Sequence, residues 1–197
     1  MKINRPSPEQ PIPANAKLVF RGKLFDVYQW RQRMFDGSYQ TFEKLKRVDT
    51  VMVVPTTSQG KIILIDEEQP GRGSFLSAVG GRVEQGESVL DTAKRELLEE
   101  TGHEAYEFSL WDAVQPVSKI DWAVYTFIAK GSTKVSDPKP DAGEKITPRF
   151  VSFDEFINLV SESEFRDREI TLKLLNEGFK LSGGETEVAK LKNLFFD

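Results

Sequence analysis

Three glutamates crowd the end of one predicted helix, and their spacing is suited to metal chemistry. Glu96, Glu99 and Glu100 lie within the stretch RELLEETG, and residues three or four apart share one face of an α-helix. Like charges at this spacing repel one another by a few tenths of a kcal/mol per pair. A hard divalent cation such as Mg²⁺ or Mn²⁺, which prefers oxygen ligands, would turn this repulsion into shared attraction. The alternative is an acidic helix face that is simply solvated.

The residues before the helix extend these glutamates into a longer pattern. Gly81 is followed after five residues by Glu87, and after seven more by the run RELLEETG. Chance agreement at seven such positions has odds on the order of 10⁻⁸ per window, at a usage of about 7% per residue type. The segment resembles the Nudix box, the signature of the Nudix hydrolases. It departs at one position, because His103 stands where the family has an aliphatic residue, and we assign this histidine no role.

The resemblance implies both a fold and a reaction. Nudix hydrolases have an α/β (α+β) fold, an α/β/α sandwich with a mixed β-sheet. They cleave a nucleoside diphosphate linked to another moiety, using a divalent metal and an attacking water. Carried over to this chain, the resemblance implies that Glu96, Glu99, Glu100 and the carbonyl group of Gly80 hold Mg²⁺ (or Mn²⁺). It also implies catalytic roles for Glu99 and for Arg95, which would orient the glutamates.

Two further glutamates have implied roles. Glu87 would brace the loop before the helix by pairing with Arg95. In several branches of the family, the general base is a glutamate from a loop well after the box. Glu144, in the segment PDAGEKI, is the candidate here. A loop carboxylate of this kind is equally explained as a surface residue, so both interpretations stay open.

Beyond the box, the layout resembles the ADP-ribose and ADP-sugar pyrophosphatase branch. That branch carries an N-terminal β extension, here VFRGKLFDVYQW, and a loop with an arginine before the box, here Arg72 in EEQPGRG. The resemblance implies ADP-ribose or another nucleotide sugar as substrate, Arg72 as a substrate-binding residue, and a homodimer formed through the extension. Trp30 is the candidate for stacking on adenine, with Phe25 and Tyr28 beside it, although ordinary packing within the hairpin is the commoner explanation of such rings.

Departures from that branch leave the substrate open. The branch has Glu-apolar-Pro-Ala-Gly before the box, whereas this chain reads FLSAVGG, and Pro116 lies closer to the box than the proline of the branch. A different nucleotide sugar, a dinucleoside polyphosphate or a damaged nucleoside triphosphate therefore remains an alternative. So does a catalytically silent module that senses a nucleotide or binds a partner, although such modules usually lose the box glutamates. A purely structural protein with an acidic helix is the third hypothesis.

The composition is typical of one globular domain with a small appendage. The chain has 197 residues, of which 39% are hydrophobic and 29% are charged. The net charge of −4 argues against a nucleic-acid-coating surface, but not against a small nucleotide bound through a metal ion. The absence of cysteine excludes a disulfide framework, thiolate metal ligands and a cysteine nucleophile. Without a long apolar run or an apolar signal core, we expect no membrane segment and a cytoplasmic location.

The elements that position the box can be predicted from periodicity. From Ser88 onward, Leu90, Ala93 and Leu97 recur at helical spacing, and Gly102 is placed to end the helix. The pair Asp36-Gly37 signals a hairpin. We expect strands over residues 24–33, 40–45, 48–57, 61–66, 109–116, 122–131 and 149–153, a polar loop over 136–147, and helices over 154–162, 167–178 and 185–196.

The predicted chain divides into four parts. Residues 1–13 form a flexible N-terminal arm, and residues 14–45 form the N-terminal β extension. Residues 46–180 form the Nudix hydrolase domain, and residues 181–197 form a C-terminal helical tail.

Overall fold

The computed structural model describes residues 3–177 and 185–197, so the predicted boundary at residues 180 and 181 lies outside the described residues. The strands before the first helix are β1 (Lys17–Arg21), β2 (Asp26–Arg33), β3 (Tyr39–Lys46), β4 (Thr50–Thr57), β5 (Ile62–Gln69), β6 (Arg72–Ser77) and β7 (Val79–Arg82). The elements that follow are α1 (Val89–Thr101), β8 (His103–Glu104), β9 (Glu107–Val114), β10 (Ile120–Asp121), β11 (Val124–Lys134), β12 (Lys145–Val151), α2 (Phe153–Leu159), α3 (Arg168–Asn176) and α4 (Glu185–Phe196).

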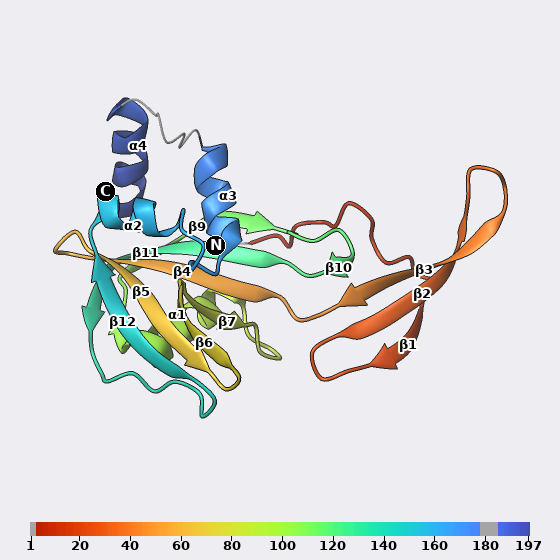
Figure 1. Ribbon diagram of the computed structural model, residues 1–197, viewed down its shortest axis with the longest axis horizontal. Coiled ribbons are helices and arrows are strands. Elements are labelled where there is room, and N and C mark those ends of the chain that lie inside the picture. Colours follow the sequence, from red (N-terminus) through yellow and green to blue (C-terminus); the bar gives the residue numbers. More distant parts are fainter. Residues whose placement is uncertain (1–2, 178–184) are drawn as a thin grey trace.

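The larger sheet is mixed and is covered by helices on both faces. Its strand order is β12-β5-β4-β11-β8, with β6 paired to β5, β7 paired to β4 and β9 paired to β11. Strands β4 and β11 run parallel, and the other pairs are antiparallel. Helix α1 covers one face, while α2, α3 and α4 cover the other (Figure 1). The predicted α/β/α sandwich is therefore confirmed.

Alternation along β4 explains why both faces are buried. Side chains of a strand point alternately to opposite faces. Val51 and Val53 belong to the hydrophobic cluster on the α1 side, whereas Met52 and Val54 belong to the cluster formed with α2, α3 and α4. A strand that is covered on both faces reads as a continuous apolar run. The run VMVV in the sequence is therefore the signature of this central strand.

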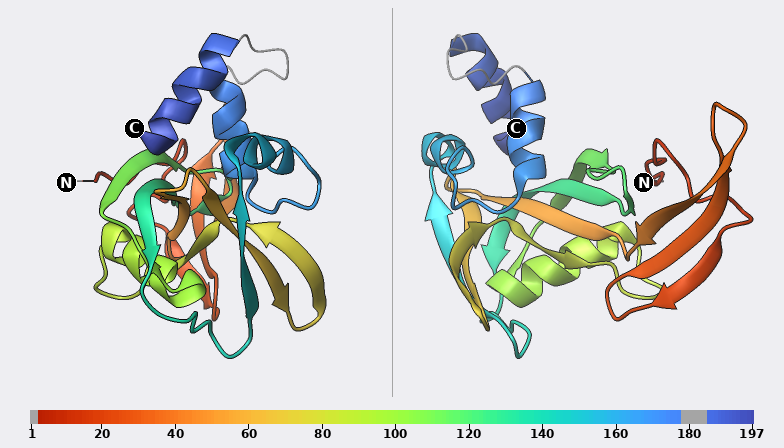
Figure 2. Two further views of the ribbon diagram at one scale, coloured as in Figure 1. Left: turned by 90° about the vertical axis from the view of Figure 1, so that its left-hand side faces the viewer. Right: turned by 45° about the vertical axis from the view of Figure 1, so that its right-hand side comes forward.

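The N-terminal extension forms a separate small sheet that projects from the sandwich (Figure 2). The β2–β3 hairpin turns at Asp36-Gly37, as predicted, with Gly37 at a φ of 86°. The Oδ1 atom of Asp36 accepts hydrogen bonds from the backbone N–H and the hydroxyl group of Ser38. Strand β10 was not predicted; it pairs in parallel with β3 and thereby joins the extension to the loop before β11.

The N-terminal arm, which we expected to be flexible, is held against the rest of the chain by specific contacts. The guanidinium group of Arg5 donates to Asp49 at 2.8 and 2.9 Å and to Asp121 at 2.8 Å. The buried Lys44 ammonium group of β3 donates to the carbonyl oxygen of Gln10 at 2.6 Å. These contacts join the arm to the extension and to the sandwich, across large separations that a sequence pattern does not reveal.

Most predicted elements differ from the observed ones by a few residues at their ends, and two differences bear on the site. The expected polar loop over residues 136–147 ends earlier, because β12 begins at Lys145 and pairs with the end of β5. Arg72 was expected in an exposed loop. It is exposed, but it begins β6 after a tight connection from β5. In both places an antiparallel partner strand extends the strand beyond its apolar residues.

A short segment between α2 and α3 extends the sheet beyond β6. Phe165 forms a parallel bridge with Leu76, and the backbone N–H of Arg166 donates to the carbonyl oxygen of Leu76 at 2.8 Å. The carboxyl group of Asp167 accepts a hydrogen bond from the backbone N–H of Ala78 at 2.7 Å. Burial of this carboxyl group raises the pKa of Asp167 to about 6. The segment thus holds the chain immediately before β7 and the box.

We predict that Asp167→Asn changes the dependence of stability on pH. The pKa of Asp167 is about 6 in the folded chain and near 3.8 ordinarily. Between these values the folded state binds more protons than the unfolded state, so the free energy of unfolding falls as the pH rises. The full shift corresponds to roughly 3 kcal/mol. In urea unfolding from about pH 4 to about pH 7, the variant should lose less stability than the wild type.

The matched control is Asp154→Asn, which changes an exposed carboxyl group at the start of α2. This control should follow the pH profile of the wild type. The same profile in Asp167→Asn would contradict the prediction.

Candidate functional site

Helix α1 begins and ends at the predicted positions because its two ends carry strong local signals. The Ser88 side chain accepts a hydrogen bond from the backbone N–H of Asp91, which caps the N-terminus. Gly102 ends the helix with a φ of 70°, a left-handed conformation that glycine adopts readily. With both ends fixed, the helix points one row of carboxylates toward β7 and packs Ala93 and Leu97 on the sheet.

Arg95 binds three glutamates of this region at once. Its guanidinium group makes a two-point contact with Glu87, with nitrogen–oxygen distances of 2.9 and 3.1 Å. Its Nη1 atom donates to Glu96 and to Glu99, both at 2.9 Å. The predicted Glu87–Arg95 pair is therefore present, and Arg95 contacts two of the three expected metal ligands. The hydrogen bond from Arg95 lowers the pKa of Glu87 to about 2.

Glu96 and Glu100 are withdrawn from water at the contact between α1 and β7. Glu100 accepts a hydrogen bond from the backbone N–H of Gly80 at 2.9 Å, and its side chain is nearly inaccessible. Burial raises the pKa of Glu96 to about 7, although Arg95 opposes the shift. Burial also raises the pKa of Glu100 well above its usual value. Negative charge is therefore unfavourable here unless more positive charge is supplied.

Glycines allow the strand to approach these carboxylates. A β-carbon added to Gly81 would lie 2.1 Å from the Oε1 atom of Glu96. One added to Gly80 would lie 2.1 Å from the carbonyl oxygen of Val51 on the neighbouring strand. Only glycine fits at either position without displacing an atom, so β7 can place its backbone directly beside the acidic row.

The C-terminus of α1 positions the distant loop that carries Glu144. The backbone N–H groups of Val135 and Ser136 donate to the carbonyl oxygen of Gly102, and that of Lys139 donates to the carbonyl oxygen of Glu99. These contacts satisfy carbonyl groups that a helix end leaves free. The following residues then run beside the helix, and the charge of half-buried Glu144 contributes to the raised pKa of both Glu96 and Glu100. Burial and the charge of Glu67 raise the pKa of Glu144 itself.

The donor set fits a divalent cation in its chemistry. Glu96, Glu99, Glu100 and Glu144 offer carboxylate oxygens, the ligand type preferred by Mg²⁺ and Mn²⁺, and one guanidinium group leaves them with excess negative charge. Among the described residues, no three acidic, histidine or cysteine side chains are already grouped as a metal site. Arg95 lies between Glu96 and Glu99 instead, so a cation would require these side chains to reorient.

Glu67 is a site residue that the sequence analysis missed. It is a buried carboxylate on β5 that lies 3.4 Å from the hydroxyl group of Ser77 and 3.5 Å from the guanidinium group of Arg166. Its charge contributes to the raised pKa of both Glu100 and Glu144. No local motif marks Glu67, because strand pairing alone brings it to the box. Glu67 belongs to the polar run DEEQ at the end of β5, so its residue type did not distinguish it from its neighbours.

Several arginines of separate elements lie against aromatic rings or near one another. Arg72 lies over the ring of Phe75 at 4.1 Å. Arg47 lies 4.6 Å from the ring of Trp122. Burial and the charges of Arg82 and Arg166 lower the pKa of Arg47. Arg47, Arg82 and Arg166 therefore lie in one region, and the charges of Arg82 and Arg166 also act on Glu144.

The ring of Trp30, the predicted stacking residue, is buried within the N-terminal extension. It is 6% exposed, its indole N–H donates to Gln32, and its ring centroid lies 6.0 Å from that of Phe42. The interpretation of ordinary hairpin packing describes its position.

His103, a departure from the box pattern, is buried rather than at the surface. Its Nδ1 atom lies 2.8 Å from the carbonyl oxygen of Thr101, and its ring lies 5.7 Å from that of Phe150. It therefore occupies the buried environment that an aliphatic residue would fill.

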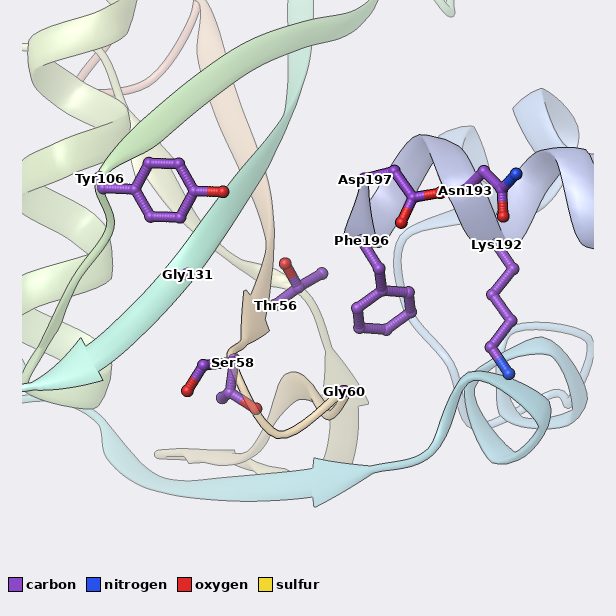
Figure 3. A pocket seen from close by; sticks show the side chains of 10 residues that line it. Thr56, Ser58, Gly60, Tyr106, Gly131, Lys192, Asn193, Phe196 and Asp197 are labelled. Atoms are coloured by element: carbon purple, nitrogen blue, oxygen red, sulfur yellow. The ribbon is translucent and has the colours of Figure 1, made fainter.

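A cavity of about 490 Å³ lies elsewhere, between the β4–β5 turn, Tyr106 and helix α4 (Figure 3). Lys192, Asn193 and Phe196 line it from the helix side. None of the residues that line it belongs to the box, so it is separate from the acidic site.

Within the described residues, no helix has the length and apolarity needed to cross a membrane.

Comparison with known proteins identifies the family of this chain. A family model described as the NUDIX domain matches residues 46–174. The chain is 28% identical over 152 residues to an ADP-ribose pyrophosphatase of Bacillus subtilis (strain 168). This alignment covers 76% of this chain and 82% of the relative. It is 25% identical over 158 residues to a methanol dehydrogenase activator of Bacillus methanolicus, covering 78% and 85% of the two chains.

Two further similarities concern hydrolases of ADP compounds. The chain is 32% identical over 104 residues to the ADP compounds hydrolase NudE of Escherichia coli (strain K12), covering 51% of this chain and 55% of the relative. A crystal structure of an ADP compounds hydrolase superposes with a TM-score of 0.69 at 23% identity, covering 93% of this chain and 98% of the other. This structural likeness supports the fold.

We predict that Gly81→Ala weakens Mn²⁺ binding while the chain still folds. The added β-carbon would meet the end of the Glu96 side chain, which can move away at small cost, but the carboxylate would leave its position beside β7. Affinity in a calorimetric titration should fall by roughly tenfold or more. Gly73→Ala is the control, because its β-carbon would meet no atom within 4 Å. Equal Mn²⁺ affinity in both variants would contradict the placement of the site.

Proposed function

The chain belongs to the Nudix family and is a Nudix pyrophosphohydrolase, and from this premise we propose that it cleaves ADP-ribose or another nucleotide sugar with Mg²⁺ or Mn²⁺. The products would be a nucleoside monophosphate and a sugar phosphate. The observation that carries the proposal is the buried acidic row of Glu96 and Glu100, held against β7 and short of positive charge. The two similar proteins named for hydrolysis of ADP-ribose or ADP compounds support the choice of substrate class.

The residues of the chain have separable tasks in this reaction. A divalent metal, when bound, neutralises phosphate oxygens and lowers the pKa of a coordinated water. Glu96, Glu99, Glu100 and the carbonyl group of Gly80 would hold the metal, which explains why Glu96 and Glu100 tolerate burial. Arg95, which is fixed by Glu87 and contacts Glu96 and Glu99 through its Nη1 atom, would orient these two carboxylates after they turn toward a cation. Arg72, exposed at the start of β6, would bind the substrate.

Glu100→Gln should abolish conversion of ADP-ribose to AMP in the presence of Mg²⁺. The amide keeps the size of the side chain and an oxygen for the backbone N–H of Gly80, but it removes the negative charge. We expect the rate to fall by at least about a hundredfold, as for other residues that stabilise a charged transition state. Product separation by chromatography measures it, and Glu104→Gln, on the exposed strand just after the helix, is the control.

The panel of substrates decides between the alternatives. If the wild type forms no AMP from ADP-ribose, other nucleotide sugars, dinucleoside polyphosphates and nucleoside triphosphates follow in the same assay. Cleavage of one of these would replace ADP-ribose as the substrate. Nucleotide binding without any product, in Mg²⁺ or Mn²⁺, would instead favour a silent sensing module.

We further propose that Glu144 is the general base. Its carboxyl group has a raised pKa through burial and nearby charge, which suits a group that accepts a proton from the attacking water. Glu144→Gln should lower kcat by about 10²- to 10⁴-fold and leave KM nearly unchanged. Asp137→Asn, an exposed change in the segment that leads to this loop, should leave kcat unaffected. A kcat loss shared by both variants would point to the loop conformation rather than to a base.

The extension suits a homodimer, as its resemblance to the branch implies. Several large apolar residues of this sheet are exposed, among them Val19, Phe20, Leu24 and Phe35. If these residues form one contiguous patch, it would be a surface on which a second copy could pack. Sedimentation equilibrium would detect the dimer as twice the monomer mass, and a monomer at all concentrations would contradict it.

A further inference from the structure

Arg166 lies on the same face of the sheet as the box helix, although it comes from the loop between α2 and α3. Ile65 packs with the α1-side cluster, so Glu67, two residues further along β5, points to that side as well. Phe75 pairs with Glu67 and shares this face. Leu76 and Phe165 pair on the opposite face, where both belong to the other cluster. Arg166, the next residue, therefore returns to the α1 side.

The contacts of Arg166 agree with this placement. Its Nη1 atom lies 3.5 Å from Glu67, a loose ion pair, and its guanidinium group lies 5.1 Å from the centre of the Phe75 ring. The same ring carries Arg72 at 4.1 Å. The backbone of this loop is fixed by Arg168, which donates to the carbonyl oxygens of Glu162 and Ser163. The position of Arg166 is therefore set by the hydrogen bonds of Arg168 to the loop backbone and by the ring of Phe75 beside its guanidinium group.

Most hydrogen-bond donors of Arg166 have no acceptor among the described residues. A guanidinium group has five N–H donors, and among the described residues its side chain has only the loose pair with Glu67. The side chain is 42% exposed. Its charge acts on Arg47 together with that of Arg82, so three arginines share one region. Such a concentration of like charge next to a metal-binding acidic row is complementary to a phosphate group.

We propose that Arg166 is a substrate-binding residue that contacts a phosphate oxygen of the nucleoside diphosphate. This inference rests on the proposed function and adds a contact from outside the box and outside the loop of Arg72. The acidic row binds one part of the diphosphate through the metal, and Arg166 binds it from the far side of Glu67. The competing explanation is that Arg166 only neutralises the buried Glu67 carboxylate.

The first test is steady-state kinetics of Arg166→Gln on a substrate that the wild type cleaves. Loss of a hydrogen bond to a charged group should raise KM roughly tenfold to a hundredfold, with kcat within about threefold. Arg149→Gln is the matched control, because Arg149 pairs with Asp66, the neighbour of Glu67 on β5, and its side chain is 46% exposed. This pair lies on the opposite face, so the control should keep the KM of the wild type.

The double variant Glu67→Gln/Arg166→Gln separates substrate binding from neutralisation. If Arg166 binds phosphate, the KM increase of Arg166→Gln persists when Glu67 carries no charge. If Arg166 only neutralises Glu67, the double variant regains the KM of Glu67→Gln alone, and this result would overturn the proposal. Arg166→Lys, which keeps the charge, should recover part of the affinity.

Calorimetric binding of ADP with Mg²⁺ distinguishes failure of this inference from failure of the proposed function. A wild type that cleaves nothing in the panel but binds ADP more tightly than Arg166→Gln would remove the proposed activity and support the role of Arg166. A wild type that cleaves its substrate with the same KM and ADP affinity as Arg166→Gln would overturn the role of Arg166. A wild type that neither cleaves nor binds would overturn both.

Discussion

The withdrawal of Glu96 and Glu100 from water is the constraint on which the rest of the site depends. A buried carboxylate is unfavourable in its charged form unless partners stabilise it. Here the partners are one guanidinium nitrogen for Glu96 and one backbone N–H for Glu100, and both pKa values stay raised. The charge balance is therefore incomplete within the described residues, and a bound cation is the simplest group that would complete it.

The backbone around the box follows from this constraint. The acidic row can be buried only if a strand without side chains lies against it, and Gly80 and Gly81 provide that strand. The strand in turn is paired with β4 and preceded by Ala78, whose N–H is held by Asp167. The helix end is held by residues 135–139. Elements far apart in sequence thus fix the relative position of α1 and β7, whose separation determines the geometry of the carboxylates.

The parts predicted correctly from the sequence are those with local causes. Ser88 and Gly102 set the two ends of α1 through capping interactions within a few residues. The turn at Asp36-Gly37 likewise depends on a local hydrogen bond, from Ser38 to Asp36. The pairing of β10 with β3, the contacts of Arg5, and the approach of Glu67 and Arg166 all depend on strands and loops meeting across the fold. Neither periodicity nor a short motif predicts contacts between residues so far apart in the sequence. The flexible arm was expected from its prolines and polar residues, whereas specific ion pairs hold it.

This division between local and distant causes has a functional counterpart. The residues that would bind metal come from one short segment, so a sequence motif is enough to predict the type of reaction. The arginines come from the entry to β4, the start of β6, the end of β7 and the loop before α3, and Arg47, Arg82 and Arg166 meet in one region. A substrate with two phosphates and a further group must extend beyond the box helix, because the carboxylates there bind anions only through a cation. We therefore expect its identity to be recognised by side chains whose spacing in the sequence carries no pattern. The same box can accordingly serve different nucleotide substrates when these surrounding loops differ.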